Sequence, residues 1–376
     1  IRFGPAGIPL SCKGRTLKDG IMDVHTLSLT ALEIQMVRAH IVTLTPEELD
    51  MDLHKKDMTI MDLEEDFVVE AYRDGMALTP EDPLEDEDEL VIMTNPVVSS
   101  FSELASVGHM ARRLDVSLSV HTPYYMDLGS NEPITEGCVN AIRHAGIVLD
   151  ALGGDVVVTN LGLHTGKVPD EEYDDNIYNN LAYIKDWWNE MGLSPKLGIE
   201  TTGQQAAFGS YDQILDLCDE REFKGFLVPV VNFPHYDSRE NGVLEASEAN
   251  PNPVDNVLDI LKQVEKYYKK SSIQVNFSGV EHVDGEELRL TPIKKGNLKF
   301  DTIADAFTEY KGDVTVISSS PLLEHDAMYM KVIYERNFSK RVAKQIREER
   351  RKEEERLKAE EAAAAAAASA EPAEDE

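Results

Sequence analysis

The chain has 376 residues, of which 42% are hydrophobic and 28% charged, and its formal net charge at pH 7 is −33. This length and apolar content are enough for a large buried core, whereas the negative charge opposes nonspecific binding to nucleic acid, which depends on Lys and Arg neutralising phosphates. No apolar run approaches the roughly 18 residues of a membrane span, so we expect no membrane association.

The first seven residues and the cysteines indicate a reducing compartment. Ile1 to Gly7 show no basic segment followed by an apolar one, as a signal peptide would, and we therefore expect a cytoplasmic protein. Cys12, Cys138 and Cys218 are isolated in the sequence, which favours neither a disulfide framework nor a cysteine zinc site.

Apolar, β-branched runs and amphipathic segments alternate along the chain. The runs predict eight strands, at residues 2–3, 31–37, 116–121, 155–160, 196–201, 226–232, 272–277 and 313–318. Helical i, i+3, i+4 spacing occurs between most of them, as in 138–152, 176–191, 254–268 and 300–310. Alternating strands and helices imply parallel strands with right-handed crossovers, and eight repeats predict a closed (β/α)8 TIM barrel, with a doubly wound open sheet as the alternative.

Two segments depart from this pattern. Residues 45–96 are acidic, contain short β-like runs at 67–72 and 90–93 and carry the turn signal Asp74-Gly75, which predicts an inserted β excursion. It is either a lid or partner surface over the barrel, or a solvated insertion.

We assign residues 1–335 to the barrel and 336–376 to a charged helix followed by a low-complexity, acidic tail without fixed structure at its end. Seven basic residues lie between Lys340 and Lys352. They would either contact nucleic acid or pair with acidic neighbours four residues away on a solvated helix.

Polar residues end six of the predicted strands. Because the carboxyl ends of barrel strands meet at one mouth, these side chains predict a pocket for a metal ion or a small polar molecule. They are His121, Asn160, Glu200, Asn232 with His235 beyond it, Asn276 and Ser318.

The motifs around these positions resemble one family. The stretch Val120-His121-Thr122-Pro123-Tyr124-Tyr125-Met126-Asp127-Leu128 resembles the His-x-Pro-Tyr motif of the endonuclease IV family of apurinic/apyrimidinic endonucleases, within the xylose isomerase-like barrels. Phe3-Gly4-Pro5-Ala6-Gly7 resembles the start of its archaeal members. Glu200-Thr201-Thr202-Gly203-Gln204 is similar to the family's Glu-x-x-x-Gly-Gln stretch, with one residue fewer before the Gly.

The resemblance implies a phosphodiesterase that cuts DNA beside abasic sites with three zinc ions at the barrel mouth. His121, Glu200 and His235 match family metal ligands, with Glu200 also a catalytic candidate and Tyr124 a contact to the nucleic acid. Other family ligands are replaced by neutral side chains: Asn160 for a His, Asn232 for an Asp, Asn276 for a His and Ser318 for a Glu, while residues 288–291 lack the family's Asp-x-His pair.

Amides and hydroxyls are poor zinc ligands, so we expect fewer than three ions, or none. Loop residues after the strand ends are candidate substitute ligands: His164, Asp237, Glu281, His282 and Asp284.

Three functions follow as hypotheses. The first is an endonuclease IV-like, metal-dependent phosphodiesterase acting on abasic DNA. The second is a noncatalytic or repurposed barrel that binds a polar metabolite, a nucleotide or a protein partner. The third is a sugar isomerase or epimerase, which needs a general base and a metal on opposite pocket walls, where only Glu200 is well placed.

Overall fold

The computed structural model describes residues 1–36, 40–49, 58–63, 67–79, 81–94, 101–248, 250–269 and 271–369. Within them, eight parallel strands form one sheet in the order β1-β16-β13-β12-β10-β8-β7-β2. Their bounds are Arg2–Pro5 (β1), Ala31–Gln35 (β2), Ser117–His121 (β7), Val156–Thr159 (β8), Lys196–Glu200 (β10), Leu227–Asn232 (β12), Ile273–Phe277 (β13) and Val314–Ser318 (β16). The eight predicted strands are confirmed, except that predicted residue 37 lies outside the described residues.

The sheet closes on itself, which rules out the open-sheet alternative. Its two end strands, β1 and β2, meet through a parallel bridge between Ala6 and Glu33. Gly4 allows this approach, because a Cβ atom there would stand 1.8 Å from the carbonyl oxygen of Ala31. The (β/α)8 TIM barrel is therefore confirmed.

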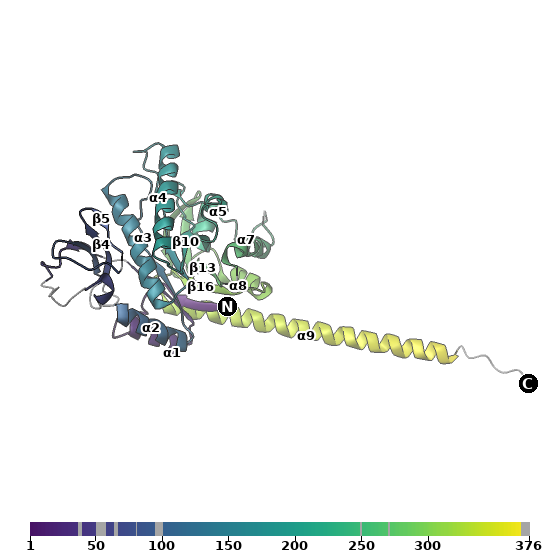
Figure 1. Ribbon diagram of the computed structural model, residues 1–376. Helices are drawn as coiled ribbons and strands as arrows, with labels where there is room; N and C mark the ends of the chain where they lie inside the picture. The colour runs from purple at the N-terminus through teal and green to yellow at the C-terminus, as the bar shows by residue number, and fades with distance from the viewer. Residues whose placement is uncertain are drawn as a thin grey trace, which may run out of the picture.

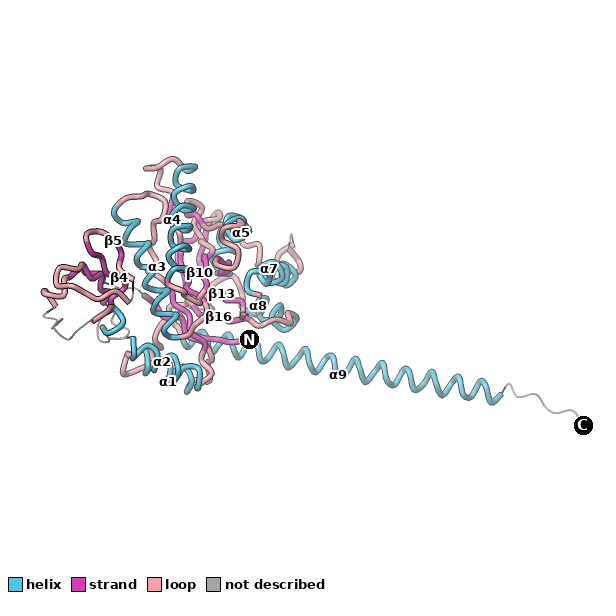
Figure 2. Tube along the Cα trace, in the orientation of Figure 1, coloured by secondary structure: helices cyan, strands magenta, loops and turns pink. Residues whose placement is uncertain are grey.

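Helices surround the strands, as the cyan and magenta layers of Figure 2 show. The four predicted helices are confirmed within longer or similar spans. The helices around the barrel are α1 (Leu17–Thr26), α2 (Phe101–Arg113), α3 (Pro133–Leu152), α4 (Asp170–Glu190), α5 (Tyr211–Asp219), α6 (Phe233–Arg239), α7 (Pro253–Tyr268) and α8 (Phe300–Glu309).

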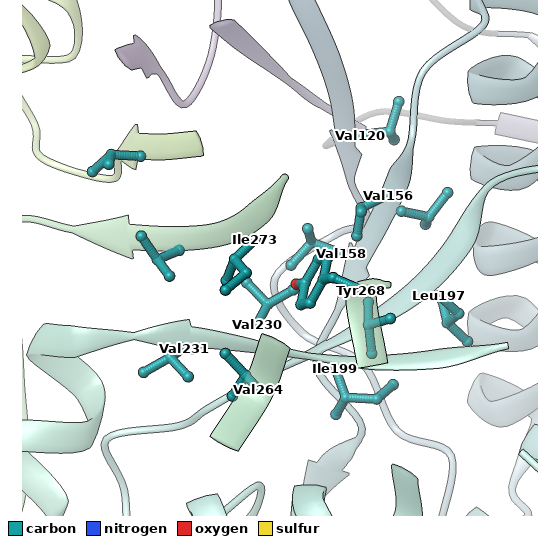
Figure 3. Close-up of a cluster of buried hydrophobic side chains, with 14 of the residues drawn as sticks. Val120, Val156, Val158, Leu197, Ile199, Val230, Val231, Val264, Tyr268 and Ile273 are labelled. Carbon is teal, nitrogen blue, oxygen red and sulfur yellow. The ribbon is translucent and has the colours of Figure 1, made fainter. Parts of the chain in front are cut away.

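Aliphatic side chains from the strands and the inner helix faces make one continuous core. Figure 3 shows part of it, where strand residues such as Val158, Val230 and Ile199 lie close to Val264 and Tyr268 of α7. Tyr268 is fully buried and its hydroxyl donates a hydrogen bond to the carbonyl oxygen of Pro229, 2.9 Å away. The core thus fixes the position of the strands whose carboxyl ends carry the polar residues.

The excursion between β2 and α2 is a separate antiparallel sheet in the order β3-β6-β4-β5. Asp74 and Gly75 both take positive φ, 51° and 75°, in the predicted turn. In Figure 1 the sheet lies beside α3, and Glu70 pairs with Arg143 of that helix. Residues 50–57, 64–66, 80, 95 and 96 of the predicted excursion lie outside the described residues. Its elements are β3 (His40–Leu44), a 3-10 turn (Ile60–Asp62), β4 (Phe67–Arg73), β5 (Met76–Ala77) and β6 (Glu89–Thr94).

The last helix, α9 (Glu324–Ser369), leaves the barrel as a single rod (Figure 1). Ala327, Met330 and Ile333 in its first turns are buried, whereas residues 344–365 are exposed. The polyalanine run from Ala362 continues the helix because alanine has the highest helix propensity, and residues 370–376 lie outside the described residues. No described helix combines the length and the apolar character needed to cross a membrane.

Candidate functional site at the barrel mouth

Alternate residues of each barrel strand point into the barrel, and the last inward position of β7 and of β10 carries a charge. The imidazole Nε2 of His121 lies 3.3 Å from the Oε2 atom of Glu200. His121 Nδ1 donates to the carbonyl oxygen of Thr122 at 2.7 Å. Both side chains are buried, so the sequence has placed an ion pair at the base of the mouth.

Two amides complete the shell around Glu200. Its Oε1 atom accepts hydrogen bonds from the Nδ2 atoms of Asn232, at 3.0 Å, and Asn276, at 2.6 Å. Both asparagines end neighbouring strands, β12 and β13, which pair in register at these residues. Every oxygen of the Glu200 carboxylate therefore already has an N–H donor from the protein.

The charges of His121 and Glu200 stabilise each other. Burial opposes the charge of Glu200, but the hydrogen bond and charge of His121 outweigh it and lower the pKa of Glu200 to about 2. Burial likewise opposes charge on His121, yet the Glu200 carboxylate raises its pKa to about 9. At neutral pH the pair is a carboxylate and an imidazolium.

A second polar layer lies one inward position deeper. The carboxyl group of Glu33, on β2, is buried and accepts from Gln35 and from Gln274, each at 2.9 Å. Gln274 Nε2 also contacts Ser119 Oγ at 3.1 Å. Burial, only partly offset by the charge of His121, raises the pKa of Glu33 to about 7.

His235 reaches the same mouth from α6. Its Nδ1 atom donates to the carbonyl oxygen of Thr201 at 2.8 Å, and Asn232 Nδ2 lies 3.4 Å from its Nε2 atom. Asn232 thus links His235 to Glu200. Glu287 Oε2 stands 3.4 Å from the same Nε2 atom.

A cleft of about 370 Å³ opens beside this cluster. Tyr124 and Tyr125 line it with their rings edge to face at 5.2 Å, and burial raises the pKa of the Tyr124 hydroxyl to about 12. Its polar lining includes Asn160, Glu287 and Arg289. The hairpin of β14 (Gly279–Val283) and β15 (Glu286–Thr291) contributes the last two.

Two residues predicted to belong to the pocket, His164 and Ser318, do not line the cleft. His164 follows the short strand β9 (Gly162–Leu163), which pairs with β11 (Ala207–Phe208), and its ring nitrogens face Asp170 and Asp174 at 3.1 and 3.2 Å. Ser318 is fully buried at the end of β16, and its hydroxyl has no hydrogen-bond partner among the described residues.

Sequence reasoning missed Glu33, Gln274 and Glu287. Glu33 did give a signal, because a lone charge interrupts the apolar run of β2 at an inward position. Glu287 lies one residue before the segment 288–291 in which family ligands were sought.

The donor set at the mouth does not fit a centre of three zinc ions. Neutral side chains stand at four positions where the resemblance implied metal ligands, and two of them, Asn232 and Asn276, turn N–H groups rather than lone pairs towards Glu200. Among the described residues, one group of three or more His, Cys, Asp or Glu side chains has ligand atoms that all lie within 4.8 Å of one another. This group lies outside the mouth. His121, Glu200 and His235 do not form such a group.

Comparison with known proteins identifies the barrel type. Residues 74–319 match the family model described as xylose isomerase-like TIM barrel. An uncharacterized protein of Methanocaldococcus jannaschii is 30% identical over 224 residues, which cover 58% of this chain and 77% of the relative.

Solved structures share the fold at low identity. A D-tagatose 3-epimerase-like protein has a TM-score of 0.53 at 16% identity, covering 91% of this chain and 100% of that protein. Endonuclease IV from Thermus thermophilus has a TM-score of 0.53 at 12% identity, covering 90% and 100%. At these identities the likeness shows the fold alone.

Proposed function

Because the chain belongs to the xylose isomerase-like TIM barrel family, we propose that its mouth binds a small, hydroxyl-bearing metabolite such as a sugar or polyol. One observation carries this proposal: Asn160 Oδ1, a buried acceptor in the lining of the cleft, has no hydrogen-bond partner among the described residues. Buried acceptors normally have donors, and ligand hydroxyl groups would supply them.

The shape and lining of the cleft suit such a ligand. Its volume of about 370 Å³ is in the range of small-molecule sites. The rings of Tyr124 and Tyr125 offer apolar faces beside the polar lining, and both side chains are at least half exposed before binding. The sugar-epimerase name of one protein with the same fold points to the same ligand class.

The charge of the mouth favours a neutral ligand over a polyanion. Glu200 is compensated by His121, so the pair offers no free cation to a phosphate. Glu287 adds a carboxylate to the cleft, with Arg289 as the cation in its lining, and Arg289 pairs with Glu281 at 2.9 Å. The formal charge of −33 opposes nucleic acid further.

A thermal-shift screen of aldoses, ketoses and polyols, with chelator present, tests the proposal. A ligand that binds only the folded state raises Tm, and we expect at least one compound to do so. The shift should disappear in Asn160→Ala and persist in Asn189→Ala, which removes an exposed asparagine of α4 outside the cleft. An unresponsive wild type, or equal shifts in both variants, would contradict the proposal.

An endonuclease IV-like phosphodiesterase is the second candidate function. It is favoured by the convergence of His121, Glu200 and His235, which Asn232 joins in one hydrogen-bonded chain. This activity would require divalent ions held by those residues. Chelator-sensitive nicking of an abasic duplex that is lost in Glu200→Gln would support it. A wild type without nicking, with zinc supplied, would eliminate it.

A further inference from the structure

A second cluster of ligand-type side chains lies outside the barrel mouth. It contains Asp237 of α6, Glu245 of the following loop and His282 of β14, and one ligand atom from each lies within 4.8 Å of the other two. None of the three lines the cleft described above. The cluster therefore needs its own explanation.

The backbone is shaped to bring these residues together. Asn241 and Gly242 take positive φ, 56° and 84°, and the resulting turn lets the backbone N–H of Leu244 donate to Asp237 Oδ1 at 2.6 Å. Glu245 follows directly. On the other side, the pairing of β14 with β15 shifts register between Glu281 and His282, and bulges of this kind re-aim a side chain.

Four polar atoms of the cluster lack hydrogen-bond partners among the described residues. Asp237 is fully buried, and its Oδ2 atom has no hydrogen-bond partner among the described residues. Both ring nitrogens of His282 and the Oε1 atom of Glu245 also have none, although the His282 side chain is only 11% exposed. Buried groups left in this state are costly, so each such exception calls for a missing partner.

An ion pair within the cluster does not supply that partner. His282 Nε2 and Glu245 Oε1 are 3.8 Å apart, beyond hydrogen-bond distance. Even a protonated His282 would leave Asp237 Oδ2 without a donor. A cation between the three groups would contact Asp237 Oδ2, Glu245 Oε1 and one ring nitrogen of His282.

We propose that Asp237, Glu245 and His282 bind one divalent transition-metal ion. One imidazole and two carboxylates suit zinc, whereas calcium and magnesium prefer oxygen ligands alone. Around a tetrahedral zinc ion the ligand atoms stand roughly 3.4 Å apart, so small side-chain rotations from the present arrangement would complete the site. Water would take the fourth position.

The ion would tie the β14–β15 hairpin to α6, independently of what the mouth binds. β14 packs against α6, which also carries His235, and the hairpin carries Glu287. A metal bound to Asp237 and His282 would hold these two elements together through residues that do not line the cleft. It would thereby position Glu287 against His235.

Metal analysis of the full-length protein tests this site. Chelator-treated wild type is titrated with zinc and, separately, with cobalt, whose visible absorption reports its coordination. We expect one ion per chain. Loss of His282 in His282→Ala should weaken zinc binding by more than the ~10- to 100-fold typical of losing an outer-shell partner. Glu245→Gln should also weaken it, and because Glu245 is partly exposed this variant retains the fold, as circular dichroism would verify.

A matched variant locates the ion. His325→Ala removes an exposed histidine outside the cluster and should bind zinc as the wild type does. Absence of zinc binding in the wild type would overturn the proposal. So would binding that survives unchanged in His282→Ala and Glu245→Gln, or binding that is weakened equally in His325→Ala.

Discussion

The ion pair of His121 and Glu200 makes the stability of the barrel depend on pH. Glu200, with its pKa lowered from 4.5 to about 2, stabilises the fold above pH 4.5 and loses this contribution as the pH falls through 2. His121, with its pKa raised from 6.5 to about 9, contributes fully below pH 6.5 and loses this as the pH rises through 9. The pKa of Glu33 is raised from 4.5 to about 7, so its contribution to stability is complete below pH 4.5. This contribution is lost as the pH rises through 7.

We therefore predict that Glu33 and His121 together lower the free energy of unfolding between pH 5 and pH 9. His144, whose pKa burial lowers from 6.5 to about 3, opposes this fall only below pH 6.5. Urea denaturation at pH 5, 7 and 9 measures it. In Glu33→Gln the part of the fall between pH 5 and pH 7 should shrink, while the part between pH 7 and pH 9 remains. A free energy that stays constant or rises over this range would contradict the charges assigned to the pair.

For single residues, the sequence predicted which side chains lie at the mouth better than it predicted their hydrogen-bond partners. His121, Glu200, Asn232 and Asn276 follow from strand ends, because register and alternation put them at the mouth. Which atoms meet does not follow, since that depends on the tilt and stagger of strands distant in the chain. Glu33 was missed for the same reason: its partner Gln274 is 241 residues away.

Among the elements, the seam between β1 and β2 is the most demanding part of the barrel. We predict that Gly4→Ala prevents folding or costs more than about 4 kcal/mol, because the added Cβ would stand 1.8 Å from Ala31 O. Gly137→Ala is the matched control: a Cβ there meets nothing within 4 Å in α3, and it should stabilise by about 0.5 to 1 kcal/mol. Urea denaturation compares the two, and an unaffected Gly4→Ala would refute the close approach.

Elements with strong local signals were predictable, and short ones were not. Strands such as β12 (Leu227–Asn232) are continuous apolar runs. The two-residue strands β9 and β11 exist only because they pair with each other across the mouth, so no local pattern indicates them. The polyalanine run was interpreted as part of a low-complexity tail, although the high helix propensity of alanine predicts the helix that is observed there.

At the scale of the whole molecule, α9 has two parts: its first turns pack on the barrel, and residues 344–365 are exposed to solvent. We predict that deleting residues 346–376 leaves Tm nearly unchanged and lowers the helical circular dichroism signal, because residues 346–365 are exposed. Deleting from Glu324 onwards would also remove Ala327, Met330 and Ile333 and should abolish cooperative unfolding. A large loss of Tm from the shorter deletion would show that the rod packs on the barrel.

Family membership fixes the architecture of this molecule more closely than its chemistry. The barrel places six polar strand ends at one mouth, yet amides and a self-compensated ion pair stand where the resemblance implied zinc ligands. For this reason we propose a hydroxyl-bearing ligand for the mouth rather than a group of metal ions.

Calorimetric titration of the chelator-treated protein with the best compound from the sugar and polyol screen tests this most directly. The account predicts saturable binding of one ligand per chain without added metal, abolished in Asn160→Ala and retained in Asn189→Ala. Binding that appears only after zinc is restored and is lost in Glu200→Gln would contradict it, because the mouth would then be a metal centre.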